Sequence, residues 1–177
     1  MGNCFLVVNP DKREYLDPSC FGDNDKTGGY MQGYHAIAVA MLACPSPGLS
    51  IGPLDGFWNG DRIVTATESA SPNQHGLKTV TDDFPNRNLY KMSCDEFENL
   101  SYKALAMICE RSKNIAADLA KRAKSEFDNS NGRSTFLLSH LGNCFFGADG
   151  SCLDEALSEF FDEDWKDIYE RTRQFQR

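Results

Sequence analysis

His140 and Cys144 are the side chains whose types and spacing come nearest to catalytic chemistry. They stand four residues apart in the stretch HLGNC, and residues at i and i+4 share one face of a helix. An imidazole beside a thiol stabilises the thiolate, which is the nucleophile of cysteine enzymes. His35 is a further candidate if the fold brings a cysteine to it. Gly142 and the two phenylalanines that follow Cys144 favour a second interpretation, in which His140 and Cys144 belong to the core.

The Gly-rich stretch 22–33, GDNDKTGGYMQG, contains fragments of two ligand-binding motifs. DNDKTG fits the start of an EF-hand calcium loop, but Tyr34 stands where the bidentate Glu is required. GGYMQG has the glycine spacing of a P-loop without its Lys and Ser/Thr. Tight turning is therefore favoured over ligand binding. It stays open whether this stretch binds an anion through its backbone amides or binds a metal. The sequence predicts no metal site and no cofactor.

Trp58, Asp61 and Arg62 surround the dipeptide Asn59-Gly60, which is a strong signal for a β-hairpin turn. An exposed aromatic side chain next to two opposite charges is a common recognition element, so these three residues form a candidate binding site. Alternatively, Trp58 packs inward and the two charges only flank the turn. The alternation of strand residues alone does not decide which face is buried.

Acidic residues gather near the C-terminus. The segment from Asp149 to Glu170 holds nine of them and a single basic residue, and its net charge equals the −8 of the whole chain. A field of this sign repels phosphate backbones and so disfavours direct binding of nucleic acid. It favours either a solvated helix face or a surface for a basic protein partner. Glu155, Glu159 and Glu163 are the candidate contacts.

The elements that must position these residues are predicted strands in the N-terminal half of the chain and predicted helices in the C-terminal half. Residues 5–8 and 14–16 predict a hairpin around Asn9-Pro10-Asp11. The stretch GYHAIAVAMLAC favours a buried helix of about ten residues over a strand. Residues 57–58 and 62–64 predict a second hairpin, and residues 69–88 a polar excursion.

The C-terminal half has helical periodicity. Ser93-Cys94-Asp95-Glu96 predicts a capping box that opens a helix. A break is expected at 112–114, and a second helix follows it, with Asp118 and Arg122 as an i,i+4 pair. Residues 136–146 leave strand and short helix open. An apolar stripe from Leu153 to Tyr169 predicts one last amphipathic helix, which starts at Ser151.

The predicted fold class is α+β, in which a small antiparallel sheet from N-terminal hairpins packs against C-terminal amphipathic helices. With 177 residues the chain fits a single domain, 1–177. Its parts are a sheet-rich segment (1–68), a polar loop (69–92) and a helical segment (93–177).

The cysteines and the lack of targeting segments indicate a cytoplasmic protein. Seven cysteines, an odd number, are scattered without a C-x-x-C pair, which is typical of reduced thiols. No secretory signal is recognisable, and no apolar run reaches the roughly 18 residues that span a membrane. The sequence does not fix the oligomeric state.

Several stretches together resemble a group of small uncharacterised bacterial and fungal proteins. These proteins open with L-V-V-N-x-D-K-R-x-Y, as residues 6–15 do, and carry W-x-G-D-R-I, as residues 58–63 do. GYHAIAVAML, PNRNLY and HLGN also fit, so the resemblance extends through most of the chain. It implies one intact domain, and it carries no activity and no site residues.

Two functions follow as hypotheses. The first is a non-catalytic interaction protein that binds a protein partner through the acidic C-terminal helix, the Trp58 turn or both, because no complete catalytic set is present. The alternative is a small enzyme with a Cys–His nucleophilic centre.

Overall fold

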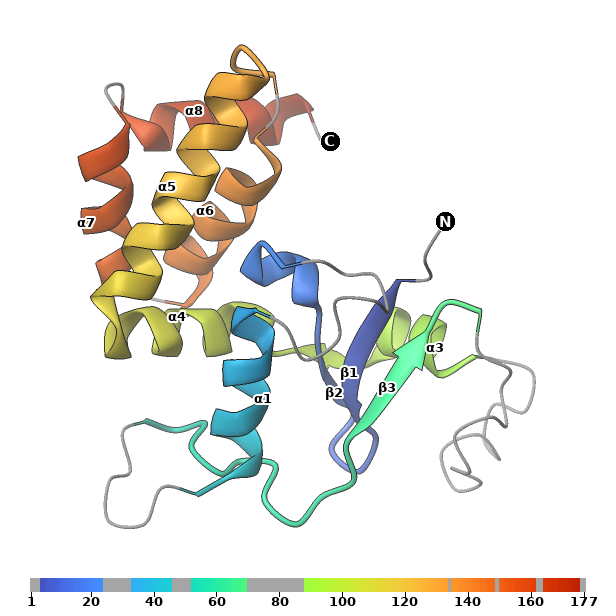
Figure 1. Ribbon diagram of the computed structural model, residues 1–177. Coiled ribbons are helices and arrows are strands. Elements are labelled where there is room, and N and C mark those ends of the chain that lie inside the picture. Colours follow the sequence, from blue (N-terminus) through green and yellow to red (C-terminus); the bar gives the residue numbers. More distant parts are fainter. Residues whose placement is uncertain are drawn as a thin grey trace. The chain divides into compact units, whose positions relative to one another are not determined.

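The structure, a computed structural model, describes residues 4–23, 33–45, 52–69, 88–133, 135–148, 150–161 and 164–175. The chain divides into two compact units. The first unit contains Met1–Ser19 and Asp23–Ser101, and the second contains Cys20–Gly22 and Tyr102–Arg177. All the strands belong to the first unit among the described residues, and long helices make up the second (Figure 1). The fold class is α+β, as predicted.

A four-stranded sheet organises the first unit. Its order is β3-β1-β2-β4, and the strands are β1 (Phe5–Asn9), β2 (Glu14–Leu16), β3 (Val64–Thr67) and β4 (Glu98–Asn99). β1 is antiparallel to both β2 and β3, whereas β4 runs parallel to β2. The predicted first hairpin is confirmed. Its turn depends on Asn9, whose Oδ1 accepts hydrogen bonds from the amides of Asp11 (3.0 Å) and Lys12 (3.1 Å).

Both faces of this sheet are covered. Successive side chains of a strand point to opposite faces, so Leu6 and Val8 face one way with Tyr15 and Ala66. They form a cluster with residues of helix α3 (Leu89–Glu96) and with Phe97. Phe5 faces the other way and meets the ring of His35 in helix α1 (Tyr34–Ala43) at 5.7 Å between centroids.

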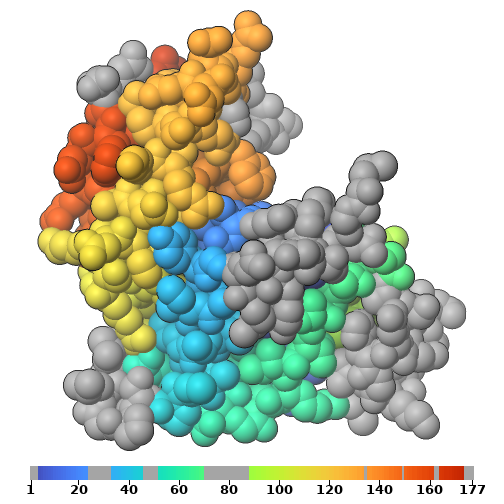
Figure 2. All heavy atoms as spheres, in the orientation of Figure 1, coloured from blue at the N-terminus to red at the C-terminus, as the bar shows by residue number. Residues whose placement is uncertain are grey.

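Helix α1 has the ten residues that the sequence predicts. Its inward side buries His35, Ala38 and Leu42, while Ile37 is 44% exposed. Figure 2 shows this helix in light blue at the surface of the first unit. The short 3-10 helix η1 (Pro18–Phe21) follows β2 in the chain.

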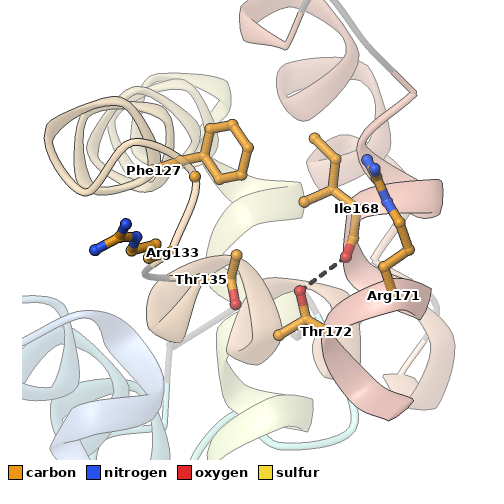
Figure 3. A pocket seen from close by; sticks show the side chains of 7 residues that line it. Phe127, Arg133, Thr135, Ile168, Arg171 and Thr172 are labelled. Carbon is orange, nitrogen blue, oxygen red and sulfur yellow. Dashed lines mark hydrogen bonds between the residues drawn. The ribbon is translucent and has the colours of Figure 1, made fainter. Parts of the chain in front are cut away.

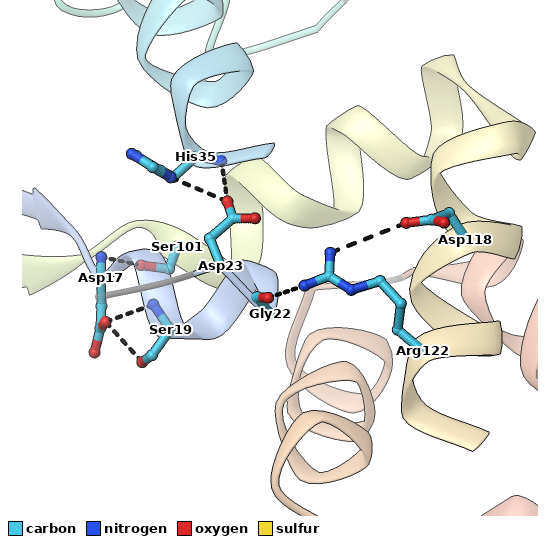
Figure 4. A network of polar contacts seen from close by, with 8 residues as sticks. All are labelled: Asp17, Ser19, Gly22, Asp23, His35, Ser101, Asp118 and Arg122. Atoms are coloured by element: carbon cyan, nitrogen blue, oxygen red, sulfur yellow. Dashed lines mark hydrogen bonds and ion pairs between the residues drawn. The ribbon is translucent and has the colours of Figure 1, made fainter. Parts of the chain in front are cut away.

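The second unit contains five helices in the described part of the chain: α4 (Ser101–Arg111), α5 (Lys113–Asn129), α6 (Phe136–Ala148), α7 (Ser151–Phe160) and α8 (Trp165–Phe175). The predicted break falls at Ser112, and residues 136–146 are helical. Asp118 and Arg122 form the predicted pair at 3.9 Å, and Arg122 also donates to the carbonyl of Gly22 (Figure 4).

The predicted second hairpin is wrong. Residues 53–60 form consecutive turns, and only Val64–Thr67 is a strand, paired with β1. The reason is that the amides of Gly56 and Trp58 donate to the carbonyls of Met41 (2.9 Å) and Leu42 (2.8 Å). These bonds satisfy the carbonyls at the end of α1, so residues 57–58 do not join a ladder.

Two predicted helix boundaries in the C-terminal half are also wrong. Ser93 lies inside α3, where its Oγ donates to the carbonyl of Leu89 (2.8 Å), and the helix is capped by Asn88 instead. The predicted last helix is two helices, because α7 ends at Phe160 and Asp164 starts α8 by accepting the amide of Lys166 (3.0 Å). Helix α3 also begins within the predicted loop 69–92. Residues 70–87 of that loop lie outside the described residues.

None of the helices in the described ranges combines the length and the apolar character that crossing a membrane requires.

Candidate binding pocket

A pocket of about 570 Å³ lies in the second unit between the end of α5, the turn that follows it and α8. Its side chains come from two stretches of the chain. Phe127, Arg133 and Thr135 form one wall, and Ile168, Arg171 and Thr172 form the other (Figure 3). The volume is within the range of small-molecule sites, roughly 300–1,000 Å³.

The first wall is shaped by the way α5 ends. Gly132 adopts a φ of +76°, and its amide donates to the carbonyl of Phe127 (2.8 Å). This is a common glycine-dependent ending of a helix. A Cβ at Gly132 would lie 3.2 Å from Cζ of Phe127, so the glycine leaves room for the ring. The ring also meets Phe161 edge to face at 5.9 Å, which fixes its orientation.

The start of α6 supplies no free positive pole to this pocket. Glu126 of α5 accepts the amides of Phe136 (2.9 Å) and Leu137 (3.2 Å) through its two carboxylate oxygens. The exposed amides at a helix start attract anions, and here a carboxylate of the chain already occupies them. The positive charge of the pocket therefore comes from its two arginines.

The second wall is one face of α8. Ile168, Arg171 and Thr172 are at positions i, i+3 and i+4, which lie together on a helix surface. The hydroxyl of Thr172 donates to the carbonyl of Ile168 (2.8 Å), and Nε of Arg171 donates to the carbonyl of Asp167 (3.3 Å). Both polar side chains are thus oriented by their own helix.

The lining has the chemistry of a binding site. It combines two guanidinium groups and two hydroxyls with an aromatic and an aliphatic side chain, and it contains no Cys, His or carboxylate among the described residues. Guanidinium groups recognise carboxylates and phosphates through paired N–H donors. This arrangement can hold an organic anion.

The predicted His140–Cys144 pair meets a third residue, Tyr102 of α4. Nδ1 of His140 lies 3.1 Å from the Tyr102 hydroxyl, and the thiol of Cys144 donates to the Tyr102 carbonyl (3.3 Å). Burial strongly raises the pKa of Cys144. The thiol is therefore protonated near neutral pH, and thiolate chemistry is unfavourable at this position.

Gly142 and Asn143, two other residues of the HLGN stretch, also make contacts with neighbouring helices. Asn143 donates to the Tyr102 hydroxyl (3.3 Å) and accepts from the hydroxyl of Tyr169 (2.8 Å). A Cβ at Gly142 would lie 2.3 Å from the Tyr169 ring. The motif is explained by packing between α4, α6 and α8.

His35 is completely buried and is paired with Asp23. Oδ2 of Asp23 accepts the backbone amide of His35 (2.8 Å) and lies 3.0 Å from Nδ1 of its ring (Figure 4). Nε2 of His35 has no hydrogen-bond partner among the described residues. Gly33, at φ +93°, would place a Cβ 2.2 Å from the Asp23 carboxylate. Most of the Gly-rich stretch, residues 24–32, lies outside the described residues, so its ligand motifs are not tested.

Trp58, Asp61 and Arg62 all have partners within the first unit. Trp58 is fully buried, and its Nε1 donates to Oε2 of Glu14 (2.7 Å). The exposed aromatic of the predicted recognition element is therefore absent at this position, and the inward-packed alternative holds for Trp58.

The two charges join the turn of the first hairpin. Asp61 accepts from Asn9 (2.8 Å) and pairs with Lys12 (2.9 Å), and Arg62 donates to Asp11 through its backbone amide and Nε (2.8 Å each). The two motifs of the family resemblance, residues 6–15 and 58–63, thus bind each other.

The acidic candidates lie on α7. Glu155 and Glu159 are exposed, and Glu155 forms an exposed ion pair with Lys113 (3.2 Å). Glu163 lies outside the described residues.

The structure also places basic residues in the same unit as these acidic candidates. By composition, the second unit has eleven basic and thirteen acidic residues, and the first unit has seven and thirteen. The excess of negative charge is therefore larger in the first unit.

Sequence reasoning missed the pocket residues. Arg133 and Thr135 precede the apolar stretch 136–146, and Arg171 and Thr172 follow Tyr169, where the predicted stripe ends, so neither pair has a motif of its own. Only the regular spacing of Ile168, Arg171 and Thr172 marks them as one helix face.

The chain matches no model of a known protein family, no curated protein and no solved structure.

Proposed function

We propose that the protein is a non-catalytic binding protein whose second unit takes up a small organic anion in the pocket between α5 and α8. The observation that carries the proposal is the lining itself, which combines the basic residues Arg133 and Arg171 with the apolar side chains of Phe127 and Ile168. Charge-assisted hydrogen bonds from guanidinium groups hold an anion strongly, and the apolar surface accepts its hydrocarbon part.

The thiols support a binding role over a Cys–His enzyme. Burial raises the pKa of Cys109 to about 12 and raises that of Cys144 further, while a hydrogen bond to Glu110 raises the pKa of Cys152. A nucleophilic cysteine requires the opposite shift. All seven cysteines are present as thiols, which supports a proposed location in the reducing cytoplasm.

Calorimetric titration of the purified chain with benzoate and with uncharged benzamide tests the proposal. We expect benzoate to bind and benzamide to bind at least about tenfold more weakly, since a charge-assisted hydrogen bond contributes more than about 1.4 kcal/mol. Arg133→Gln should weaken benzoate binding. Arg173→Gln, on the exposed side of α8, is the matched control. Equal binding of both probes, or no binding of either, contradicts the proposal.

A basic protein partner is a second candidate function. The exposed carboxylates of Glu155 and Glu159 on α7, with Asp167 and Glu170 on α8, favour it. Lysine substitutions at Glu155, Glu159 and Glu163 should abolish binding of a lysine-rich peptide at low salt, whereas Glu96→Lys in the first unit should leave it intact. If the wild-type protein does not bind the peptide, this function is excluded.

A further inference from the structure

We propose that Asn59 is a site of spontaneous covalent modification, at which the side-chain amide is lost by deamidation, and that Asn131 is protected from the same reaction. The chain contains two Asn-Gly dipeptides, Asn59-Gly60 and Asn131-Gly132. A glycine after asparagine favours deamidation, because the missing Cβ leaves room for the reacting backbone. Both sites have this local chemistry, so their surroundings decide which of them reacts. The proposal is independent of the pocket.

The nucleophile of the reaction is the backbone amide of the glycine. The Gly60 nitrogen loses its proton and attacks Cγ of Asn59. A C–N bond forms and the bond from Cγ to Nδ2 breaks, so that ammonia leaves and a succinimide ring remains. Water then opens the ring, and attack at Cγ gives aspartate, whereas attack at the backbone carbonyl carbon gives isoaspartate. Either product carries a carboxylate in place of the neutral amide.

This nucleophile is available at Asn59. The amides on either side of it donate within the turn, that of Asn59 to the carbonyl of Gly56 (2.9 Å) and that of Asp61 to the carbonyl of Trp58 (3.0 Å). The amide of Gly60 has no acceptor in the described part of the chain. Asn59 and Gly60 are exposed, and nothing lies within 4 Å of a Cβ placed on Gly60. The ring can therefore close without displacing a neighbour, and water reaches it.

The corresponding amide is held in place at Asn131. Gly132 donates to the carbonyl of Phe127 (2.8 Å) in the turn that ends α5. A Cβ on Gly132 would lie 3.2 Å from Cζ of Phe127, so this part of the backbone is also packed. Asn131 is exposed, as Asn59 is, and exposure does not distinguish the two sites. The hydrogen bond of Gly132 must break before its nitrogen can attack, which slows the reaction.

The modification would alter the contact between residues 58–63 and the turn of the first hairpin. Asp61, two positions after Asn59, accepts from Asn9 (2.8 Å) and pairs with Lys12 (2.9 Å). Isoaspartate inserts an additional carbon into the main chain between Trp58 and Asp61, whose backbone groups are joined by a hydrogen bond. Deamidation at Asn59 therefore acts on the position of the Asp61 carboxylate.

Incubation of the folded chain at pH 8, followed over time by peptide mass spectrometry, tests the proposal. We expect Asn59 to be converted at least about fivefold faster than Asn131, the factor that corresponds to one backbone hydrogen bond. The two rates should converge in guanidinium chloride, where the hydrogen bond of Gly132 is lost. Asn59→Gln should slow the appearance of more acidic species in isoelectric focusing. Asn131→Gln is the matched control and should leave the conversion of Asn59 unchanged.

Two results would overturn the proposal. Equal rates at the two sites in the folded chain would show that the hydrogen bond of Gly132 gives no protection. An Asn59 that stays unmodified in the folded chain, whatever its rate in guanidinium chloride, would show that the turn does not permit ring closure. Conversion of Asn59 in the folded chain, with conversion of Asn131 at a similar rate only after denaturation, supports the proposal.

Discussion

At the scale of single residues, close contacts decide which side chains are tolerated. Gly142 of α6 lies against the ring of Tyr169, and Gly33 lies against the carboxylate of Asp23. Trp58 is fully buried in the first unit, and its indole N–H donates a hydrogen bond to the buried carboxylate of Glu14. Each of these positions combines packing with a specific polar or aromatic neighbour.

Gly142→Ala should destabilise the protein. Its Cβ would lie 2.3 Å from the Tyr169 ring, and overpacking of this kind costs about 1–3 kcal/mol. Gly147, in the same helix, has nothing within 4 Å of its Cβ position. Gly147→Ala should therefore stabilise the protein by up to about 1 kcal/mol, because alanine is the better helix former. Urea unfolding of both variants measures the difference, and equal midpoints would refute the packing argument.

Trp58→Phe should cost about 2–3 kcal/mol, because it leaves the buried carboxylate of Glu14 without the indole N–H at 2.7 Å. Glu14→Gln retains an acceptor oxygen at the same position and should cost less. Unfolding free energies of the two variants and of the double variant give the coupling energy. A coupling near zero means that the hydrogen bond does not contribute.

At the scale of elements, side chains from other parts of the chain accept hydrogen bonds from the first amides of several helices. Asp23 accepts an amide at the start of α1, Glu126 of α5 accepts two at the start of α6, and Glu110 of α4 accepts the amide of Cys152 (3.0 Å) in α7. Asn88, Asn99 and Asp164 accept amides locally at the starts of α3, α4 and α8. The predicted capping box at Ser93 failed because the real cap lies five residues earlier.

Glu126→Ala should destabilise the second unit by about 1–2 kcal/mol, since it removes the acceptor for two amides at the start of α6. Lys121→Ala, at an exposed position of the same helix, is the control and should change stability by no more than about 0.5 kcal/mol. Hydrogen exchange should locate the loss of protection at Phe136 and Leu137. Unchanged exchange there would contradict the capping role.

At the scale of the whole molecule, carboxylates in both units make it sensitive to acid. A hydrogen bond from Arg62 lowers the pKa of Asp11, one from Lys12 lowers that of Asp61, and the backbone amide of Cys152 lowers that of Glu110. A lowered pKa in the folded state means that the stabilisation is complete above the unfolded pKa. It is lost as the pH falls through the folded pKa.

The midpoint of urea unfolding should therefore fall as the pH decreases below the ordinary values of 3.8 for Asp and 4.5 for Glu. Glu110→Gln should be less stable than wild type at pH 7, and the difference should shrink as the pH falls below 4.5. A difference that stays constant between pH 7 and pH 3 would show that the Glu110 carboxylate is not stabilised by its contacts with α7.

Local hydrogen bonds and periodicity made part of the fold predictable from the sequence. The turn at Asn9 is closed by residues two and three positions away, so the hairpin of β1 and β2 was predicted correctly. The apolar composition of residues 34–43 was sufficient to predict helix α1. The interruption of the apolar stripe at 112–114 predicted the break at Ser112. The α+β class resulted from these elements.

Tertiary structure alone decided which distant residues meet. Asn9 and Asp61 are 52 positions apart, and Trp58 and Glu14 are 44 apart, so no local pattern could show that the two conspicuous motifs bind each other. The pocket likewise joins residues 127–135 to residues 168–172, and its charge and shape exist only when α5 and α8 are packed. The sequence determined the character of each segment, because propensity and periodicity are local. The partners of each side chain depended on the packing of segments that are far apart in the chain.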